Sequence, residues 1–176
     1  MIITGYQGIG KSTLASKYDK KIDLESSSFW KTEEVYGVEK RTRPDDWYIY
    51  YCQVAMHLSS QGYIVFVSSH AEVRKFLGFH NPDCSHYCAI YPYKKVKEDW
   101  LKKLKNRYLD SNSDKDLRAY EFAVNNYDQS TYDMWYESQY GEEYYKAVKI
   151  IEDINYNLED IVKELYKSVY NEELVL

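Results

Sequence analysis

Short apolar runs alternate with longer amphipathic segments along this chain, and the alternation predicts strands separated by helices. The run at 63–67, Tyr-Ile-Val-Phe-Val, is apolar throughout, as expected for a strand that is buried on both faces of a sheet. Strands are expected at residues 1–4, 21–25, 63–67, 87–91 and 145–152. Strands that alternate with helices predict an α/β fold, in which ligands bind at the carboxyl ends of parallel strands.

The segments between these runs have helical periodicity or are polar. Pro44 and the acids at 45 and 46 favour the start of one helix, and Gly62 favours its end. Helices are expected at residues 12–18, 44–61, 71–79, 94–108, 115–127, 130–140 and 157–170. Residues 26–43 are predicted as an irregular, polar, substrate-side loop or a short helical excursion. The 176 residues contain no repeat or linker, so we expect a single domain spanning 1–176.

Residues 5–12 read Gly-Tyr-Gln-Gly-Ile-Gly-Lys-Ser, a complete G-x-x-x-x-G-K-[ST] phosphate-binding motif between an expected strand and an expected helix. Glycines allow backbone N–H groups to approach phosphate oxygens, and the following helix directs its positive dipole end at the same anion. In this motif Lys11 reaches the β- and γ-phosphates and the Ser12 hydroxyl ligates Mg²⁺. The alternative is a chance glycine-rich turn. We predict that ATP and Mg²⁺ are bound here by Gly5, Gly8, Ile9, Gly10, Lys11, Ser12 and Thr13.

Charge and composition narrow the classes of protein to which the chain could belong. The net charge of −5 disfavours an extended nucleic-acid footprint. A glycine loop at residue 5 leaves no room for a signal peptide, and no apolar run could cross a bilayer, so we expect a cytoplasmic protein without membrane contact. Cys52, Cys84 and Cys88 lack C-x-x-C spacing, which favours a reducing compartment over disulfides. Cys84 and Cys88 with His80 and His86 allow a metal-site interpretation, but Cys88 lies in an expected strand.

Tyrosine occurs 21 times. Tyr132, Tyr136 and Tyr140 recur at the spacing of one helix face. Such rings could stack on nucleobases or could simply pack in the core and on the surface. The helical spacing favours packing.

Asp23 and Glu25 lie at the carboxyl end of an expected strand and point to the same side because they are two residues apart. A kinase needs carboxylates near the acceptor and the metal, so Asp23 is predicted as base or Mg²⁺ orienter and Glu25 as an acceptor contact. The alternative is a solvated strand end. Ser68 and Ser69 stand where a Walker B acid is often found, so Mg²⁺ is expected to rely on Ser12, the phosphates, water and Asp23 or Glu25.

Arginines are few, and phosphoryl transfer needs cations around the charge that develops on the transferred group. Arg107 and Arg118 flank a polar break at 110–114 and are predicted as catalytic cations of a lid. The acceptor is expected to contact Glu25, Arg41, Arg43, Ser69, His70 and Arg74. The alternative for each arginine is an exposed surface position, and for His70 the start of a helix. A solvated helix face is expected for Lys94, Lys95, Lys97, Lys102, Lys103 and Lys105.

With these residues identified, the chain resembles the small P-loop kinases of the nucleotide-kinase-like group, which includes adenylate, thymidylate, shikimate and gluconate kinases. The loop at 5–12 and the acids Asp23 and Glu25 carry the resemblance. Val67-Ser68-Ser69 followed by Arg74 is most similar to gluconate kinases, and the helix that follows Tyr91-Pro92 and ends at Arg107 resembles phage-type nucleotide kinases. The resemblance implies a three-layer P-loop sandwich with five parallel strands ordered 2-3-1-4-5, helices on both faces and a helical lid at about 106–145.

The activity so implied is ATP-dependent phosphoryl transfer to a small acceptor, with a nucleoside or nucleoside monophosphate as the leading candidate. A sugar acid or other small metabolite is an alternative acceptor. A nucleotide-binding regulatory or phage-accessory module with little turnover is a further alternative, because the Walker B acid and the group's Asp-Gly-Phe-Pro-Arg and Asp-Arg-Tyr acceptor signatures are absent. No Asn-Lys-x-Asp motif is present, which disfavours a GTPase.

Overall fold

The computed structural model describes residues 1–78 and 86–174. At its centre is a five-stranded sheet in which every neighbouring pair is parallel. Its strands are β1 (Ile2–Gly5), β2 (Lys21–Asp23), β5 (Ile64–Val67), β6 (Tyr87–Pro92) and β7 (Ala147–Ile151). They lie side by side in the order β2-β5-β1-β6-β7. The predicted α/β class and parallel sheet are confirmed.

Burial explains the composition of the strands. β1, β5 and β6 are buried along their whole length in the middle of the sheet. Strands that are covered on both faces carry continuous apolar runs instead of alternating ones. This is why the run at 63–67 could be recognised so readily in the sequence.

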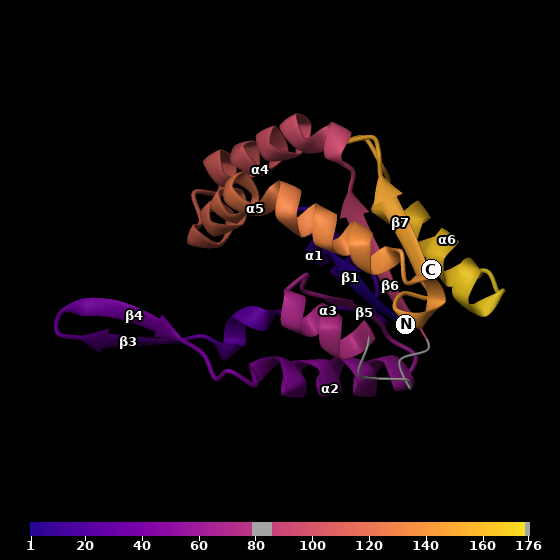
Figure 1. Cartoon of the computed structure of the whole chain (residues 1–176), viewed down its shortest axis with the longest axis horizontal. Coiled ribbons are helices and arrows are strands. Elements are labelled where there is room, and N and C mark those ends of the chain that lie inside the picture. The colour runs from indigo at the N-terminus through magenta and orange to yellow at the C-terminus, as the bar shows by residue number, and fades with distance from the viewer. Residues whose placement is uncertain (79–85, 175–176) are drawn as a thin grey trace.

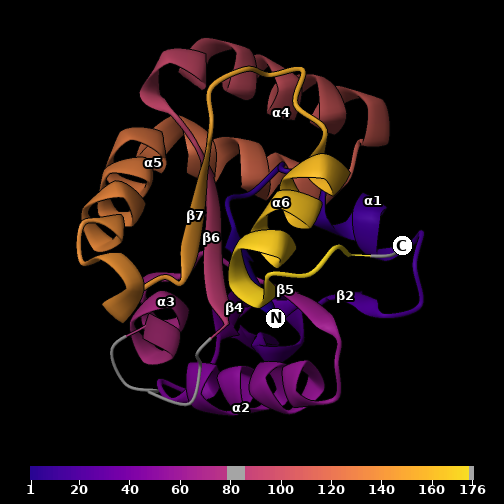
Figure 2. The same ribbon diagram turned by 90° about the vertical axis from the view of Figure 1, so that its right-hand side faces the viewer.

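Helices cover both faces of the sheet. α1 (Lys11–Ala15) and α6 (Leu158–Tyr170) lie together on one side, and α3 (Ala71–Gly78) and α5 (Asp114–Ser138) lie on the other (Figure 2). α2 (Trp47–Ser60) packs against α3 and β5, and α4 (Lys97–Ser111) packs against α5. Short 3-10 turns occupy Ser26–Phe29, Lys94–Val96 and Gly141–Glu143. None of the helices in the described ranges is long and apolar enough to cross a membrane.

The prediction of two helices at 115–127 and 130–140 is wrong, because α5 is one continuous helix of 25 residues. Ser113 caps its start by accepting a hydrogen bond from the backbone N–H of Asp116. No glycine or proline interrupts the segment around Ser130. The hydroxyl of Thr131 donates to the carbonyl of Tyr127 at 2.8 Å, so this polar side chain is satisfied within the helix.

The predicted short helical excursion is confirmed at the start of the segment 26–43, where Ser26–Phe29 form a 3-10 turn. The residues that follow are not an irregular loop. They contain an antiparallel hairpin of β3 (Lys31–Val35) and β4 (Val38–Thr42), which projects from the body in Figure 1 and is called the arm below. Tyr36 and Gly37 both have positive φ, 55° and 76°, as in a two-residue hairpin turn. The strands went unrecognised because charged side chains lie on both of their faces, so no apolar alternation marks them.

Candidate functional site

The glycine loop (residues 5–12) joins the buried strand β1 to α1. Gly8 and Gly10 have φ of 84° and 98°, a region that favours glycine. A Cβ on Gly8 would lie 2.7 Å from Leu104 Cδ2 on α4, so even a methyl group would collide there. The backbone conformation and the close approach of α4 therefore both require glycine at position 8.

Two aromatic side chains hold the glycine loop from outside. Trp100 Nε1 donates to the carbonyl of Gln7 at 3.1 Å, and the Tyr156 hydroxyl donates to the carbonyl of Ile9 at 3.0 Å. The Trp100 and Tyr156 rings are stacked, with centroids 5.8 Å apart and planes inclined by 8°. With two carbonyls engaged on the outside, the loop conformation is fixed by α4 and by the segment between β7 and α6.

Lys11 lies at the centre of the site, and its Nζ donates to the carbonyl of Gly5 at 2.9 Å. Burial is the main cause that lowers the pKa of Lys11; the carboxylates at the end of β2 oppose it, and the cations Lys115 and Arg107 add to it. Three basic side chains thus influence one another here. Such a convergence of positive charge suits a polyanion.

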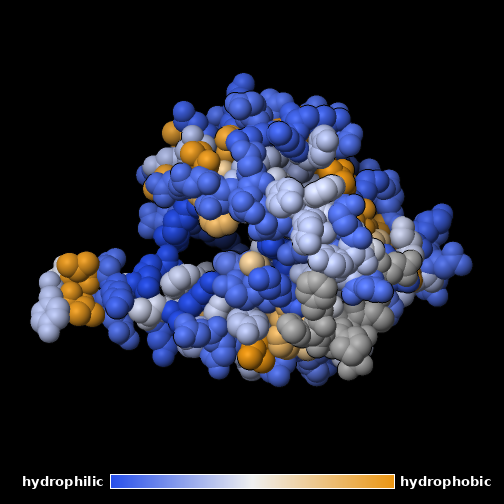
Figure 3. Space-filling model, viewed as in Figure 1, coloured by the Kyte–Doolittle hydropathy of each residue, from blue (hydrophilic) through white to orange (hydrophobic). Residues whose placement is uncertain are grey.

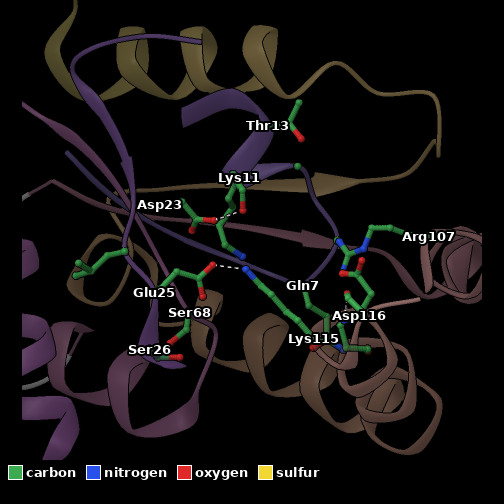
Figure 4. Close-up of a pocket in the computed structure, with 16 residues that line it drawn as sticks. Gln7, Lys11, Thr13, Asp23, Glu25, Ser26, Ser68, Arg107, Lys115 and Asp116 are labelled. Carbon is green, nitrogen blue, oxygen red and sulfur yellow. Dashed lines mark hydrogen bonds and ion pairs between the residues drawn. The ribbon is translucent and has the colours of Figure 1, made fainter. Parts of the chain in front are cut away.

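The carboxyl end of β2 faces the glycine loop, as Figure 4 shows. The Ser12 hydroxyl donates to Asp23 Oδ2, and Glu25 forms an ion pair with Lys115 across the cleft. A hydroxyl and a carboxylate are hard oxygen ligands of the kind that Mg²⁺ takes together with phosphate oxygens. In residues 1–78 and 86–174 no group of three His, Cys, Asp or Glu side chains could hold a metal. Of the cysteines and histidines that the sequence offered as a metal site, His80 and Cys84 lie outside the described residues.

Tyr51 fixes the carboxyl ends of β2 and β5 relative to each other. Its buried hydroxyl donates to the carbonyl of Leu24 at 2.6 Å and accepts from the backbone N–H of Ser68 at 2.9 Å. Burial raises the pKa of Tyr51, so the phenol is neutral. It therefore ties the ends of β2 and β5 together, which sets the position of Asp23 relative to Ser68.

These elements enclose a cleft of about 390 Å³. Its walls come from the glycine loop, the ends of β2 and β5, the end of α4 and the start of α5. The lining residues are Gln7, Gly8, Gly10, Lys11, Ser12, Thr13, Asp23, Leu24, Glu25, Ser26, Ser68, Arg107, Ser113, Lys115, Asp116 and Ala119.

Arg107 lines this cleft, but Arg118 does not. Arg107 pairs with Asp116 at 2.7 Å, whereas Arg118 is exposed on α5. Lys115, Asp116 and Ala119 on α5 line the cleft, whereas Arg118 is not among the residues that line it. The sequence did not single out Lys115, because the cap at Ser113 marks where α5 starts but not which side of it faces the loop.

A second cleft of about 460 Å³ lies beside the glycine loop, toward α6. Arg107 contributes to both clefts. The Lys103 ammonium lies 4.8 Å from the centre of the Tyr156 ring. The lining residues are Gly8, Ile9, Gly10, Thr13, Leu14, Lys17, Lys103, Arg107, Tyr156, Asn157, Leu158 and Glu159. Apart from the residues of the glycine loop, the sequence offered no motif for this second cleft.

Of the predicted acceptor contacts, Glu25 alone lines either of these two clefts. Arg74 is buried inside the protein, where its Nε donates to Glu137 Oε2 at 2.7 Å and its guanidinium also donates to the carbonyl of Ser69. Glu137 also accepts from the Tyr145 hydroxyl at 2.6 Å. Arg74 therefore joins α3 to α5 as part of the interior.

The predicted acceptor contacts Arg41, Arg43 and His70 lie beside Trp30 and Trp47, near the base of the arm. The guanidinium of Arg43 is 4.6 Å from the Trp30 ring centre and 4.0 Å from that of Trp47, and Arg41 lies 5.2 Å from the Trp30 ring. The ring of His70 meets that of Trp47 edge-on. Burial, reinforced by the charge of Arg43, lowers the pKa of His70 to about 4, so the imidazole is neutral near pH 7.

His70 Nδ1 and Ser68 Oγ are 2.9 Å apart and hydrogen-bonded. Ser68 lines the first cleft, so it connects that cleft to the His70–Trp47 contact.

Comparison with protein-family models finds no match, and comparison with curated proteins finds no similar sequence. Any inference about function therefore rests on the residues of the site and their geometry.

Proposed function

We propose that the chain is a P-loop phosphotransferase that moves the γ-phosphoryl group of Mg·ATP to a nucleoside or nucleoside monophosphate. The observation that carries the proposal is the glycine loop between a buried parallel strand and a helix, facing Asp23 at the carboxyl end of β2, which is separated from β1 by β5. Ligands of parallel α/β sheets bind at this edge.

In this proposal the triphosphate lies along the glycine loop. Lys11 neutralises the β- and γ-phosphates, while Ser12 and Asp23 hold Mg²⁺ directly or through water. Arg107 and Lys115 provide the cations that oppose charge developing on the transferred group. The acceptor oxygen attacks the γ-phosphorus, and the bond between the γ-phosphorus and the departing ADP oxygen breaks. With a nucleoside hydroxyl as acceptor, Asp23 takes the hydroxyl proton in place of orienting Mg²⁺; the phosphate oxygen of a nucleoside monophosphate attacks without a proton to lose.

We place the two substrates in the two clefts. The nucleoside of ATP occupies the second cleft, where Tyr156 offers a ring and Asn157 an amide to a base. The acceptor occupies the outer part of the first cleft, where Glu25, Ser26 and Ser68 offer hydrogen-bonding groups to hydroxyls. Arg107 borders both clefts and so lies between donor and acceptor.

The test uses γ-labelled ATP, Mg²⁺ and a panel of nucleosides, nucleoside monophosphates and sugar acids. We expect label on one acceptor class and none with Lys11→Ala. Lys115→Ala and Arg118→Ala form a matched pair three residues apart on α5. Lys115→Ala should lower kcat by roughly 10- to 100-fold as a lost charge contact, and Arg118→Ala should leave kcat unchanged. Equal effects of the two variants would contradict the assignment of Lys115.

A second candidate is a regulatory module that binds Mg·ATP with little turnover. Ser68 and Ser69 follow β5 where a metal-positioning acid is often found, and this favours it. ATP binding that Lys11→Ala abolishes, with no label on any acceptor, would support this module. Label on a sugar acid alone would keep the phosphotransferase and change its acceptor.

A further inference from the structure

Two arginines at the base of the arm have aromatic neighbours but no ion pair. The guanidinium of Arg43 lies between the rings of Trp30 and Trp47, 4.6 Å and 4.0 Å from their centres. The guanidinium of Arg41 lies 5.2 Å from the centre of the Trp30 ring. In the part of the chain that the structure describes, no carboxylate is within ion-pair distance of Arg41 or Arg43. Burial lowers the pKa of Arg43, so its charge is partly desolvated without an anion to compensate it.

The stacked position of Arg43 leaves hydrogen-bonding groups unused. A guanidinium that stacks on aromatic rings keeps its N–H donors in its own plane, where they can bind a carboxylate or phosphate in bidentate fashion. Arg43 Nη1 is buried and has no hydrogen-bond partner among the described residues. A buried donor that stays unpaired costs free energy, so the arrangement suits an anion that a ligand brings.

The base of the arm is joined to the first cleft by a short stretch of chain. Ser26 lines that cleft, and the 3-10 turn that begins at Ser26 ends one residue before Trp30. A rise of roughly 2 Å per residue places Trp30 roughly 8 Å from Ser26. Figure 3 shows a hollow with a mainly hydrophilic rim beside the base of the arm. A ligand in the first cleft can therefore extend to the two arginines.

The same arrangement keeps the two arginines away from the glycine loop. Neither Arg41 nor Arg43 lines either cleft. The side chains of Trp47, His70 and Ser68 form a chain of contacts that separates Arg43 from the first cleft. A phosphate held by the arginines is therefore too far from the γ-phosphorus of ATP to supply the oxygen that attacks it.

We propose that Arg41 and Arg43 bind the existing phosphate of a nucleotide acceptor, and that the transferred phosphoryl group goes to a hydroxyl of this nucleotide. This acceptor site rests on the proposed phosphotransferase activity and names its acceptor class. The hydroxyl oxygen attacks the γ-phosphorus, the bond to the departing ADP oxygen breaks, and the hydroxyl proton passes to Asp23. The products are ADP and a nucleotide with two separate phosphate monoesters. The ring of Trp30, 36% exposed beside both arginines, offers the base a stacking surface.

Calorimetry of the full chain measures this anion site separately from phosphoryl transfer. A non-hydrolysable ATP analogue with Mg²⁺ is kept saturating, so that the titrated nucleotide does not occupy the glycine loop. A nucleoside 3′-monophosphate or 5′-monophosphate should bind at least about tenfold more tightly than the nucleoside, and the tighter of the two identifies the position of the bound phosphate.

Variants assign this difference in affinity to the arginines. Arg43→Lys keeps the charge but loses the planar fork, and Arg41→Ala removes an exposed side chain; each should abolish most of the difference. Lys40→Ala is the matched control on β4 (Val38–Thr42) and should leave the difference unchanged, because successive side chains of a strand point to opposite faces. Equal affinity for nucleoside and nucleotides, or no loss in both arginine variants, would overturn the proposal.

The position of the label decides the chemistry. With γ-labelled ATP, transfer to a hydroxyl gives a phosphate ester that survives heating in dilute acid, whereas transfer to a phosphate gives an acid-labile diphosphate. We expect acid-stable label and a raised KM for the nucleotide with Arg43→Lys. Acid-labile label would overturn the hydroxyl acceptor and leave the proposed phosphotransferase standing. Failure of the ATP analogue to bind would contradict the phosphotransferase itself, and this acceptor with it.

Discussion

The buried ion pair between Arg74 and Glu137 gives the most direct test of how α3 and α5 are held together. The Arg74 side chain is 4% exposed and that of Glu137 is 10% exposed. Glu137 bonds to Arg74 at 2.7 Å and to the Tyr145 hydroxyl at 2.6 Å. The nearest other carboxylate is Asp133, 4.0 Å from the guanidinium and half-exposed. Glu137→Ala therefore leaves a buried guanidinium without its main anionic partner.

Removing one member of a buried ion pair costs about 3–5 kcal/mol, because the remaining charge stays desolvated. The whole free energy of unfolding of a domain is about 5–15 kcal/mol, so this is a large part of it. For a chain of this size 1 kcal/mol corresponds to roughly 2–4 °C in Tm. We expect Glu137→Ala to lower Tm by roughly 6–20 °C.

Urea and thermal unfolding followed by circular dichroism measure this effect. Glu164→Ala, which removes a surface ion pair with Lys149, is the control and should cost less than about 1 kcal/mol. Arg74→Met/Glu137→Leu removes both charges and should recover most of the loss. A cost below about 1 kcal/mol for Glu137→Ala, or a double variant as unstable as the single one, would refute the reasoning that Arg74 remains as a buried, unpaired charge.

Three further predictions follow from local geometry. The pKa of His70 is about 4 in the folded protein, below its value in the unfolded chain. As the pH falls, the imidazole therefore takes up a proton in the unfolded chain before it does so in the folded protein, and the free energy of unfolding decreases. Between about pH 7 and about pH 5 the wild type should lose about 2 kcal/mol by urea unfolding, and His70→Asn should lack this component. Gly8→Ala forces a Cβ to 2.7 Å from Leu104 Cδ2 at positive φ, so it should cost more than about 1 kcal/mol and weaken Mg·ATP binding in calorimetry. Gly37→Ala, also at positive φ but with open space around its Cβ, should change the free energy of unfolding by less than about 0.5 kcal/mol, because the turn lies between two exposed strands; a larger shift would contradict this.

The sequence by itself determined the strands of the sheet and the glycine loop. Both signals are local: continuous apolar runs mark strands buried on two faces, and the loop motif fixes its residue types through backbone conformation and close approach. The position of β2 was also readable, although the strand ends at Asp23 and not at the predicted residue 25. The hydrogen bond between Ser12 and Asp23 places Asp23 beside the loop.

The tertiary structure alone decided which cations face the loop and which arginine is interior. Arg118 and Lys115 differ by three positions, and only the packing of α4 on α5 sets which of them lines the cleft. Arg74 is paired with Glu137, 63 residues away along the chain, and nothing local distinguishes this arginine from a ligand contact. Interactions over such distances depend on how helices pack, and helix packing does not follow from composition or periodicity.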